Sequence, residues 1–190
     1  MNQHKVAIVT GASRGIGAAI SMKLAACGFR VVGIYEKSTK IANQVAKQSS
    51  LVEMVKADIA KEANVIKIIS MVVKKHDRID VLINNAGINL WGNIENFSLK
   101  DWNRMLDVNL TGKFLLCKHS IPYLRKTGGA IVNISSRAGM NEYVFSGFAS
   151  YCVVNAGIIN LTKTLSKELL SDGIKVNAII PTVTNTDRFR

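Results

Sequence analysis

The sequence predicts a doubly wound α/β fold, in which a parallel sheet of about six strands carries helices on both faces. Three observations lead to this prediction. Short apolar runs rich in β-branched residues recur along the chain, amphipathic segments of helical length separate them, and a glycine-rich turn follows the first run. Strands that are apolar on both faces and joined through helices need right-handed crossovers, which make them parallel.

The expected strands are bounded by Gly, Asn, Asp or Ser and cover residues 6–9, 30–35, 51–56, 81–84, 130–134 and 175–180. The helical patterns cover residues 16–27, 40–48, 63–75, 99–125 and 150–171. Pro122 lies near the end of the fourth pattern and should kink or end that helix, because proline lacks an N–H group. No repeat or low-complexity tract interrupts the pattern, so residues 1–190 are expected to form a single domain.

Composition narrows the class of protein. The chain is 48% hydrophobic and has no apolar run near the roughly 18 residues of a membrane span, so a soluble cytoplasmic protein is expected. Its net charge of +12 is spread without like-charge runs or interleaved aromatic residues, which favours solvated helix faces over nucleic-acid or membrane binding. A second interpretation is a basic rim that attracts a phosphate-bearing cofactor or an acidic carrier.

The cysteines Cys27, Cys117 and Cys152 are far apart and lie in apolar or helical contexts. No C-x-x-C pair and no cluster of histidines accompanies them. The sequence therefore predicts neither a disulfide framework nor a metal site.

The turn at residues 10–17 is the strongest local signal for a ligand. Its glycines, Gly11, Gly15 and Gly17, are spaced G-x-x-x-G-x-G and not G-x-G-x-x-G. A strand that turns through glycines into a helix offers unpaired N–H groups and a positive helix end to a phosphate. Ligands of open α/β sheets bind at the carboxyl ends of the strands, so a dinucleotide site is predicted here.

Two signals compete over which dinucleotide binds. An acidic residue at the end of the second strand, with Tyr35 and Glu36 as candidates, would hold a ribose hydroxyl and favour NAD. Arg14 could instead pair with a phosphate on the adenine ribose and favour NADP. The charge of Arg14 is fixed, whereas Glu36 can turn outward beside Lys37, so NADP(H) is favoured over NAD(H). Tyr35 either flanks the adenine or is a partly exposed residue at the strand end.

Further motifs occur in one order across nearly the whole chain. They are residues 10–17, 57–59, 84–87, 108–110, 133–136, Tyr151, 176–178 and Pro181. On these motifs the chain resembles the short-chain dehydrogenase/reductase family, in particular its β-ketoacyl carrier-protein reductases and acetoacetyl-CoA reductases. The resemblance implies a Rossmann-type sheet and an NAD(P)-dependent reduction of a carbonyl to an alcohol. The implied substrate is a 3-oxoacyl thioester, carried on acyl carrier protein or on CoA.

The resemblance also implies roles for individual residues. Tyr151 would be the general acid that protonates the substrate oxygen, and Ser136 would donate a hydrogen bond to the same oxygen. Asn109 would hold a water molecule or the backbone geometry of a proton path. Tyr143 is a competing phenol, but it lies in a loop with Gly and Ser and lacks a helical context.

The implied cofactor-binding residues follow the same motifs. They are Gly11, Ser13, Arg14, Gly15, Ile16, Gly17, Tyr35, Glu36, Asp58, Ile59, Asn85, Ala86, Gly87, Pro181 and Thr186. Asp58 would approach the adenine, and residues 85–87 would pass close to the cofactor and brace the site.

One departure from the family bears directly on catalysis. The family pattern is Tyr-x-x-x-Lys, but Asn155 stands four residues after Tyr151. In the family that lysine binds the nicotinamide ribose and stabilises tyrosinate through its charge, which an amide lacks. Lys163 lies two turns further along and is a poor substitute. The sequence therefore predicts slowed proton transfer in a chain that still binds cofactor.

Two other departures lie near the carboxyl end. Thr182 replaces the glycine that usually follows Pro181, and the chain ends at Arg190, where family members continue into a seventh strand and a substrate lid. A competing hypothesis is therefore a catalytically weakened nucleotide-binding protein that acts by association. The helical segments 99–125 and 150–171 resemble those that pair across subunits in the family, which implies a homodimer or homotetramer.

Overall fold

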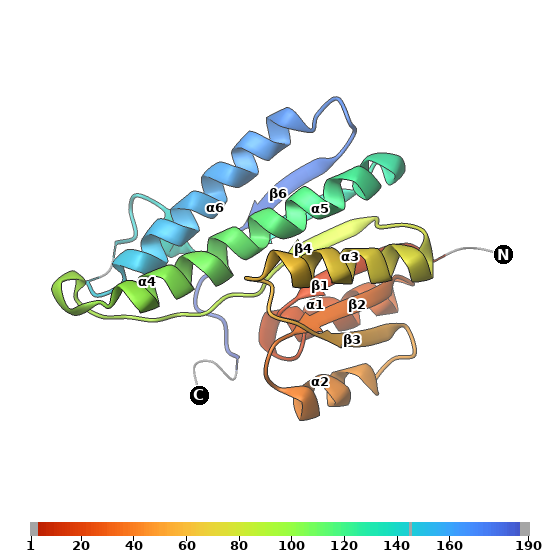
Figure 1. The fold of residues 1–190 in the computed structure, drawn as a ribbon, viewed down its shortest axis with the longest axis horizontal. Helices are drawn as coiled ribbons and strands as arrows, with labels where there is room; N and C mark the ends of the chain where they lie inside the picture. The colour runs from red at the N-terminus through yellow and green to blue at the C-terminus, as the bar shows by residue number, and fades with distance from the viewer. Residues whose placement is uncertain (1–3, 145, 187–190) are drawn as a thin grey trace.

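Six parallel strands form one sheet in the order β3-β2-β1-β4-β5-β6 in the structure, a computed structural model that describes residues 4–144 and 146–186 (Figure 1). The strands are β1 (Val6–Thr10), β2 (Arg30–Tyr35), β3 (Val52–Lys56), β4 (Val81–Asn84), β5 (Ala130–Ile134) and β6 (Lys175–Ile179). Each expected strand is present, with bounds that differ by no more than one residue. Within the described part of the chain, β3 and β6 are the edge strands.

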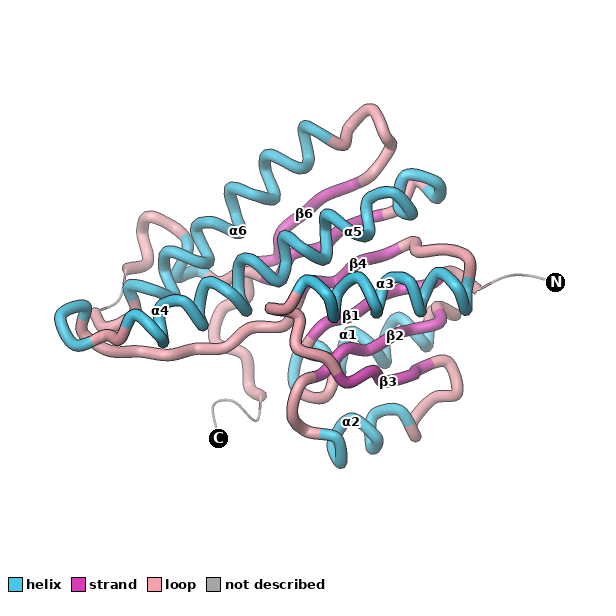
Figure 2. The backbone as a smooth tube through the Cα atoms, in the orientation of Figure 1, coloured by secondary structure: helices cyan, strands magenta, loops and turns pink. Residues whose placement is uncertain are grey.

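Helices cover both faces of this sheet (Figure 2). They are α1 (Gly15–Ala26), α2 (Thr39–Ala46), α3 (Glu62–His76), α4 (Leu99–Leu106), α5 (Gly112–Thr127) and α6 (Ala149–Glu168). Val6 and Ile8 of β1 belong to a buried cluster with α3 and α5, whereas Ala7 and Val9 belong to a second cluster with α1. Because alternate residues of a strand face opposite sides, the two clusters confirm the doubly wound arrangement. No helix among the described residues is long and apolar enough to cross a membrane.

The segment expected as one long helix has three parts. Between α4 and α5 the backbone forms a single π-helical turn, Asp107–Thr111, without leaving the helical path. Such a turn changes the direction of the side chains that follow it and is frequent at functional sites. Pro122 does not end the helix, as α5 continues to Thr127 and ends at Gly128, whose φ of 59° gives the left-handed cap that glycine favours.

The strand order reverses between β1 and β4, and the glycine turn follows β1 at this point. Gly11 and Gly15 have φ values of +64° and +54°, which side-chain-bearing residues rarely adopt. Gly17 has a different constraint, because a Cβ atom there would overlap the carbonyl oxygen of Gly11 and crowd the Asn85 amide. The absence of a side chain at Gly17 therefore lets helix α1 pack directly against the backbone at the end of β1.

Replacing Gly17 with alanine should destabilise the protein by about 2–3 kcal/mol, because the added methyl group displaces the turn. Cofactor affinity should fall with it, since the turn moves. Urea unfolding and a nucleotide titration of Gly17→Ala measure both effects. Ala19→Gly, at an exposed position of the same helix, is the control. It makes the reverse substitution where no contact is affected, so it measures the difference in helix propensity between alanine and glycine alone, about 1 kcal/mol. A Gly17→Ala variant that is as stable as the parent would contradict this account.

Candidate active site

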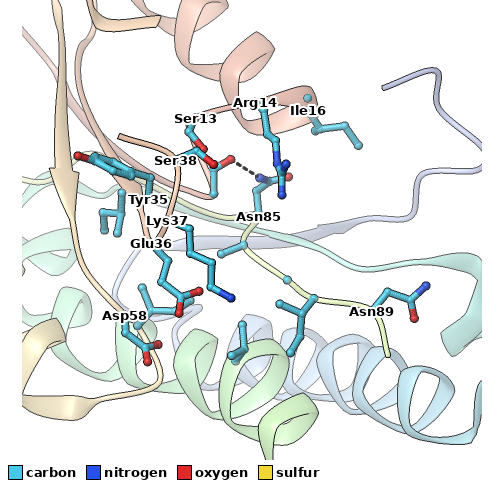
Figure 3. Close-up of a pocket in the computed structure, with 18 of the residues that line it drawn as sticks. Ser13, Arg14, Ile16, Tyr35, Glu36, Lys37, Ser38, Asp58, Asn85 and Asn89 are labelled. Carbon is cyan, nitrogen blue, oxygen red and sulfur yellow. Dashed lines mark hydrogen bonds between the residues drawn. The ribbon is translucent and has the colours of Figure 1, made fainter. Parts of the chain in front are cut away.

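Two adjoining pockets lie along the carboxyl ends of the strands. The first, of about 500 Å³, extends from the glycine turn to the ends of β2 and β3 (Figure 3). The second, of about 400 Å³, lies between the end of β5 and helix α6. Residues 85–89, which follow β4, line both pockets, as do Ile16 and Thr186. The pockets thus form a continuous cleft across the point where the strand order reverses.

The residues expected to bind cofactor are almost all in this cleft. Those in the first pocket are Gly11, Ser13, Arg14, Gly15, Ile16, Tyr35, Glu36, Asp58, Ile59, Asn85, Ala86, Gly87 and Thr186. Pro181 and Thr186 line the second. Gly17 lines neither pocket and is buried. Tyr35 is 8% exposed, so the interpretation of it as a partly exposed residue was wrong.

The loop after β4 is bonded to the glycine turn. The Asn85 side chain donates from Nδ2 to the carbonyl oxygens of Thr10 and Gly11, at 2.9 and 3.3 Å. The Thr10 hydroxyl accepts from the backbone N–H groups of Asn85 and Ala86, at 3.0 and 2.9 Å. Two motifs more than 70 residues apart therefore form one hydrogen-bonded unit, which holds the turn in place.

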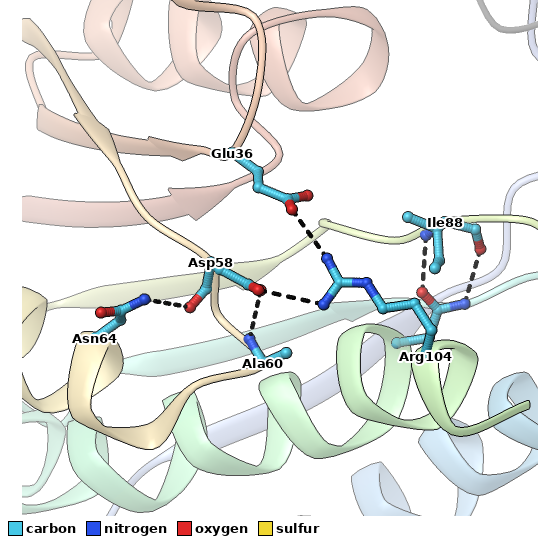
Figure 4. Close-up of polar contacts among 7 residues, drawn as sticks. Glu36, Asp58, Ala60, Asn64, Ile88 and Arg104 are labelled. Carbon is cyan, nitrogen blue, oxygen red and sulfur yellow. Dashed lines mark hydrogen bonds and ion pairs between the residues drawn. The ribbon is translucent and has the colours of Figure 1, made fainter. Parts of the chain in front are cut away.

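A three-residue ion cluster joins α4 to the segments that follow β2 and β3, beside the first pocket (Figure 4). Arg104 donates from Nη2 to Oε1 of Glu36 at 2.9 Å and from Nη1 to Oδ2 of Asp58 at 3.2 Å. The expectation that Glu36 turns outward was wrong, because Arg104 holds its carboxylate at the pocket. Lys37 also lines this pocket, and Figure 3 shows its side chain beside that of Glu36. Nothing in the local sequence around Arg104 indicates that this helical residue would pair with two carboxylates that follow β2 and β3.

The second pocket brings together the four residues expected at the catalytic centre. Asn109, Ser136, Tyr151 and Asn155 all line it. Ser136 follows β5, and Tyr151 lies on the first turn of α6, where its ring packs edge-on against Phe148 with centroids 6.3 Å apart. The competing phenol, Tyr143, does not line either pocket; it is 41% exposed and lies under the guanidinium of Arg137.

Asn109 lies in the π-helical turn, and its side-chain amide forms hydrogen bonds with both backbone polar groups of Ile88. Its Oδ1 accepts from the N–H group of Ile88 at 2.8 Å, and its Nδ2 donates to the carbonyl of the same residue at 2.9 Å. Of the two roles expected for Asn109, the contacts therefore support fixing of backbone geometry. The backbone that it fixes is the segment shared by the two pockets.

Asn155 is 6% exposed and its amide is bonded within the protein. Its Nδ2 donates to the backbone carbonyl of Tyr151 at 2.8 Å, and its Oδ1 accepts from the Ser135 hydroxyl at 3.2 Å. Both polar atoms thus tie α6 to itself and to the end of β5. Position 155 contributes hydrogen bonds to the pocket wall and no charge.

One lysine in the second pocket was missed by the sequence reasoning. Lys113, on the first turn of α5, is 4% exposed and lines the pocket, and its Nζ donates to the carbonyl of Ile134 at 2.5 Å. Burial lowers the pKa of Lys113 to about 7, which the nearby Cys117 thiol partly opposes. Its spacing of four residues from Asn109 is the signal that could have placed both on one helix face.

The described residues contain no group of three or more His, Cys, Asp or Glu side chains able to hold a metal ion. The cleft suits an elongated phosphate-bearing ligand instead. Gly11 and Gly15 line the first pocket, α1 begins at Gly15, and the cleft continues from there to Tyr151. These features fit a nicotinamide dinucleotide that spans both pockets.

A parallel sheet with a glycine turn at its switch point, joined to a pocket with a serine and a tyrosine, defines the class of nucleotide-dependent oxidoreductases. The sequence from residue 5 to residue 190 matches the short chain dehydrogenase family. The chain belongs to this family, whose members bind NAD(P) and act as oxidoreductases.

Individual relatives agree with this assignment. The chain is 42% identical over 188 residues to a 3-oxoacyl-[acyl-carrier-protein] reductase of Synechocystis sp., covering 96% of this chain and 75% of that protein. It is 35% identical to 3beta-hydroxysteroid dehydrogenase 1 of Eggerthella lenta, covering 96% and 71%. A short chain dehydrogenase from Burkholderia cenocepacia, solved in complex with NADP, superposes with a TM-score of 0.92 at 33% identity, covering 98% and 78%.

Proposed function

We propose that this protein reduces the carbonyl of a 3-oxoacyl thioester to a hydroxyl group, with NADPH as the reductant. The observation that carries the proposal is that Ser136 and Tyr151 line a pocket continuous with that of the glycine turn. A ligand bound along the cleft would lie with its phosphates at α1 and its nicotinamide near Tyr151. A substrate carbonyl would then bind in the second pocket, between the nicotinamide and Tyr151.

The bound nicotinamide would supply a hydride to the carbonyl carbon. Tyr151 would donate its phenolic proton to the carbonyl oxygen, so that the C=O double bond becomes a C–O single bond of an alcohol and a tyrosinate remains. Ser136 would donate a hydrogen bond to the same oxygen while negative charge develops on it. A proton from solvent would then restore Tyr151.

The preference for NADPH rests on the charges around the first pocket. Arg14 and Lys37 both line it and are exposed. The carboxylate of Glu36 would repel a phosphate on the adenine ribose, but Arg104 neutralises part of that charge. A guanidinium forms paired hydrogen bonds with phosphate, so Arg14 is the residue that we assign to it.

Arg14→Ala should weaken NADPH binding by about 10- to 100-fold, since a charge-assisted hydrogen bond contributes about 1.5–3 kcal/mol. NADH binding should change by less than twofold, because NADH lacks that phosphate. Fluorescence titration with each nucleotide measures the effect. Lys23→Ala is the matched control, since it removes an exposed charge from the other end of α1. Equal losses for the two nucleotides would refute the assignment of Arg14.

The substrate class is proposed from the relatives and from charge. Several relatives of this chain, at 37–42% identity, are named 3-oxoacyl-[acyl-carrier-protein] reductases. A protein with a net charge of +12 would also attract an acidic carrier protein or the phosphates of CoA. Acetoacetyl-CoA is the simplest substrate on which to test this.

Asn155 favours a second candidate, a nucleotide-binding protein that acts by association and has little catalytic activity. Titration with NADPH and NADH, followed by turnover of acetoacetyl-CoA, separates the two candidates. Turnover would support the reductase, and binding without turnover would support the second candidate. Absence of nucleotide binding would refute both.

We also propose that the protein is a homodimer or homotetramer assembled through α5 and α6, which pack into the same buried cluster on one face of the sheet. Both helices carry an exposed apolar side chain, Phe114 at 47% and Val153 at 48%. A helix-packed interface would bury both. Sedimentation at two protein concentrations tests this, and a monomer at both would contradict it.

A further inference from the structure

We propose that Lys113 supplies from helix α5 the positive charge that the family's Tyr-x-x-x-Lys pattern places on the helix of the tyrosine. The inference rests on the proposed carbonyl reduction. Lys113 is a positioning residue in it: its charge stabilises the tyrosinate form of Tyr151, while the proton itself comes from Tyr151.

The first argument is the place of the ammonium group. Lys113 donates to the carbonyl of Ile134, the last residue of β5, and the next residue, Ser135, donates to both the side chain and the backbone carbonyl of Asn155. The lysine thus reaches the same strand end as the residue that occupies the family's lysine position. It lines the same pocket as Tyr151 and Ser136.

The second argument is the shortage of partners for a buried cation. An ammonium group has three N–H donors, and the one acceptor for Lys113 among the described residues is the carbonyl of Ile134. No aspartate or glutamate is among the residues that line the second pocket. A buried charge without a counter-ion is costly, and a tyrosinate formed in this pocket would provide one.

The third argument concerns the other titratable groups near the lysine. Cys117 lies one helical turn further along α5, and burial raises the pKa of its thiol to about 12, so it stays neutral. Tyr151 on α6 and Arg137, which follows β5, are the other titratable residues that line this pocket. Of these three, Tyr151 is the one that can present a negative charge when it has given up its proton to a substrate.

The charge of Lys113 also depends on pH. Its pKa of about 7 means that the ammonium form is present below that pH and is lost above it in the empty site. Turnover in the direction of reduction should therefore fall as pH rises through this range. The negative charge that develops at Tyr151 would favour the ammonium form, so the fall should begin at a higher pH during catalysis.

The test compares Lys113→Met, Lys163→Met and the double variant Lys113→Met/Asn155→Lys. Lys163 is an exposed lysine of α6 that lines neither pocket, so its replacement controls for the loss of one charge. The readouts are kcat and KM for acetoacetyl-CoA with NADPH, measured over a pH range that brackets the Lys113 pKa of about 7.

At a pH below the Lys113 pKa of about 7, Lys113→Met should lower kcat about tenfold, with KM little changed. The high-pH fall in turnover assigned to Lys113 should disappear. Lys163→Met should behave as the parent, and the double variant should regain most of the lost kcat. A Lys113→Met variant with an unchanged kcat and an unchanged pH profile would overturn the inference.

The pH profile keeps this inference separate from the proposed function. A parent protein that does not reduce the substrate would overturn both proposals, whereas a parent that reduces it with the same kcat and pH profile as Lys113→Met would overturn this inference alone. If Lys113→Met does not fold, Lys113→Gln provides the same loss of charge with a polar side chain. A kcat and a pH profile in that variant equal to the parent's would also overturn the inference.

Discussion

Tyr151→Phe should lower kcat for carbonyl reduction by about 10²–10⁴-fold, the range that a positioned general acid contributes. Phenylalanine keeps the ring that packs against Phe148 and removes only the hydroxyl group that would carry the proton. Nucleotide affinity should therefore change by less than threefold, as the first pocket is untouched. Steady-state kinetics and a nucleotide titration measure both quantities.

Tyr143→Phe is the matched control for this experiment. It removes a hydroxyl group from a tyrosine in the loop that precedes α6. Tyr143 itself lines neither pocket, and its ring lies under Arg137, which lines the second. Its turnover should equal that of the parent. Retention of activity in Tyr151→Phe together with its loss in Tyr143→Phe would reverse the assignment of the two phenols.

Lys113→Met should stabilise the cofactor-free protein at acidic and neutral pH, by an amount on the order of 4 kcal/mol at pH 6. The pKa of Lys113 falls from 10.5 to about 7 on burial. Between these values the unfolded chain binds more protons than the folded protein, so the stability of the parent rises with pH. The cost of burying the charge is full below pH 7 and disappears as pH approaches 10.5.

Urea unfolding at pH 6, 8 and 10 tests the sign of this effect. The advantage of Lys113→Met over the parent should shrink from the lowest pH to the highest, whereas Lys163→Met should show a difference that is independent of pH. A variant that is less stable than the parent at pH 6 would show that the lysine stabilises the fold. Higher stability together with lower turnover would instead show that the lysine is retained for function at a cost in stability.

The elements of the fold could be predicted from sequence because their signals are local. A β-branched run such as that of β1 has few alternatives to a strand when it is short and followed by a glycine turn. The π-helical turn around Asn109 could not be predicted in this way, because the apolar pattern of residues 99–125 continues through it. Pro122 shows the same limit: α5 passes it because packing on α3 and the sheet outweighs one lost backbone bond.

Some features of the candidate site could also be predicted from sequence, and others could not. The glycines of the turn were enough to predict a dinucleotide site, and the family resemblance implied the catalytic phenol. The structure places Gly11, Gly15 and Tyr151 along one cleft. The hydrogen bonds of the Glu36 and Asn155 side chains could not be predicted from sequence, since their partners come from distant segments.

The sequence by itself therefore determined the order of strands and helices, the glycine turn and the departure at Asn155, all of which are properties of neighbouring residues. The tertiary structure alone decided which charges meet. It brought Arg104 of α4 to the carboxylates of Glu36 and Asp58, and it buried Lys113 of α5 at the end of β5. The physical reason is that Coulomb interactions and desolvation depend on distance and burial in space, which the packing of helices on the sheet sets and the spacing along the chain does not.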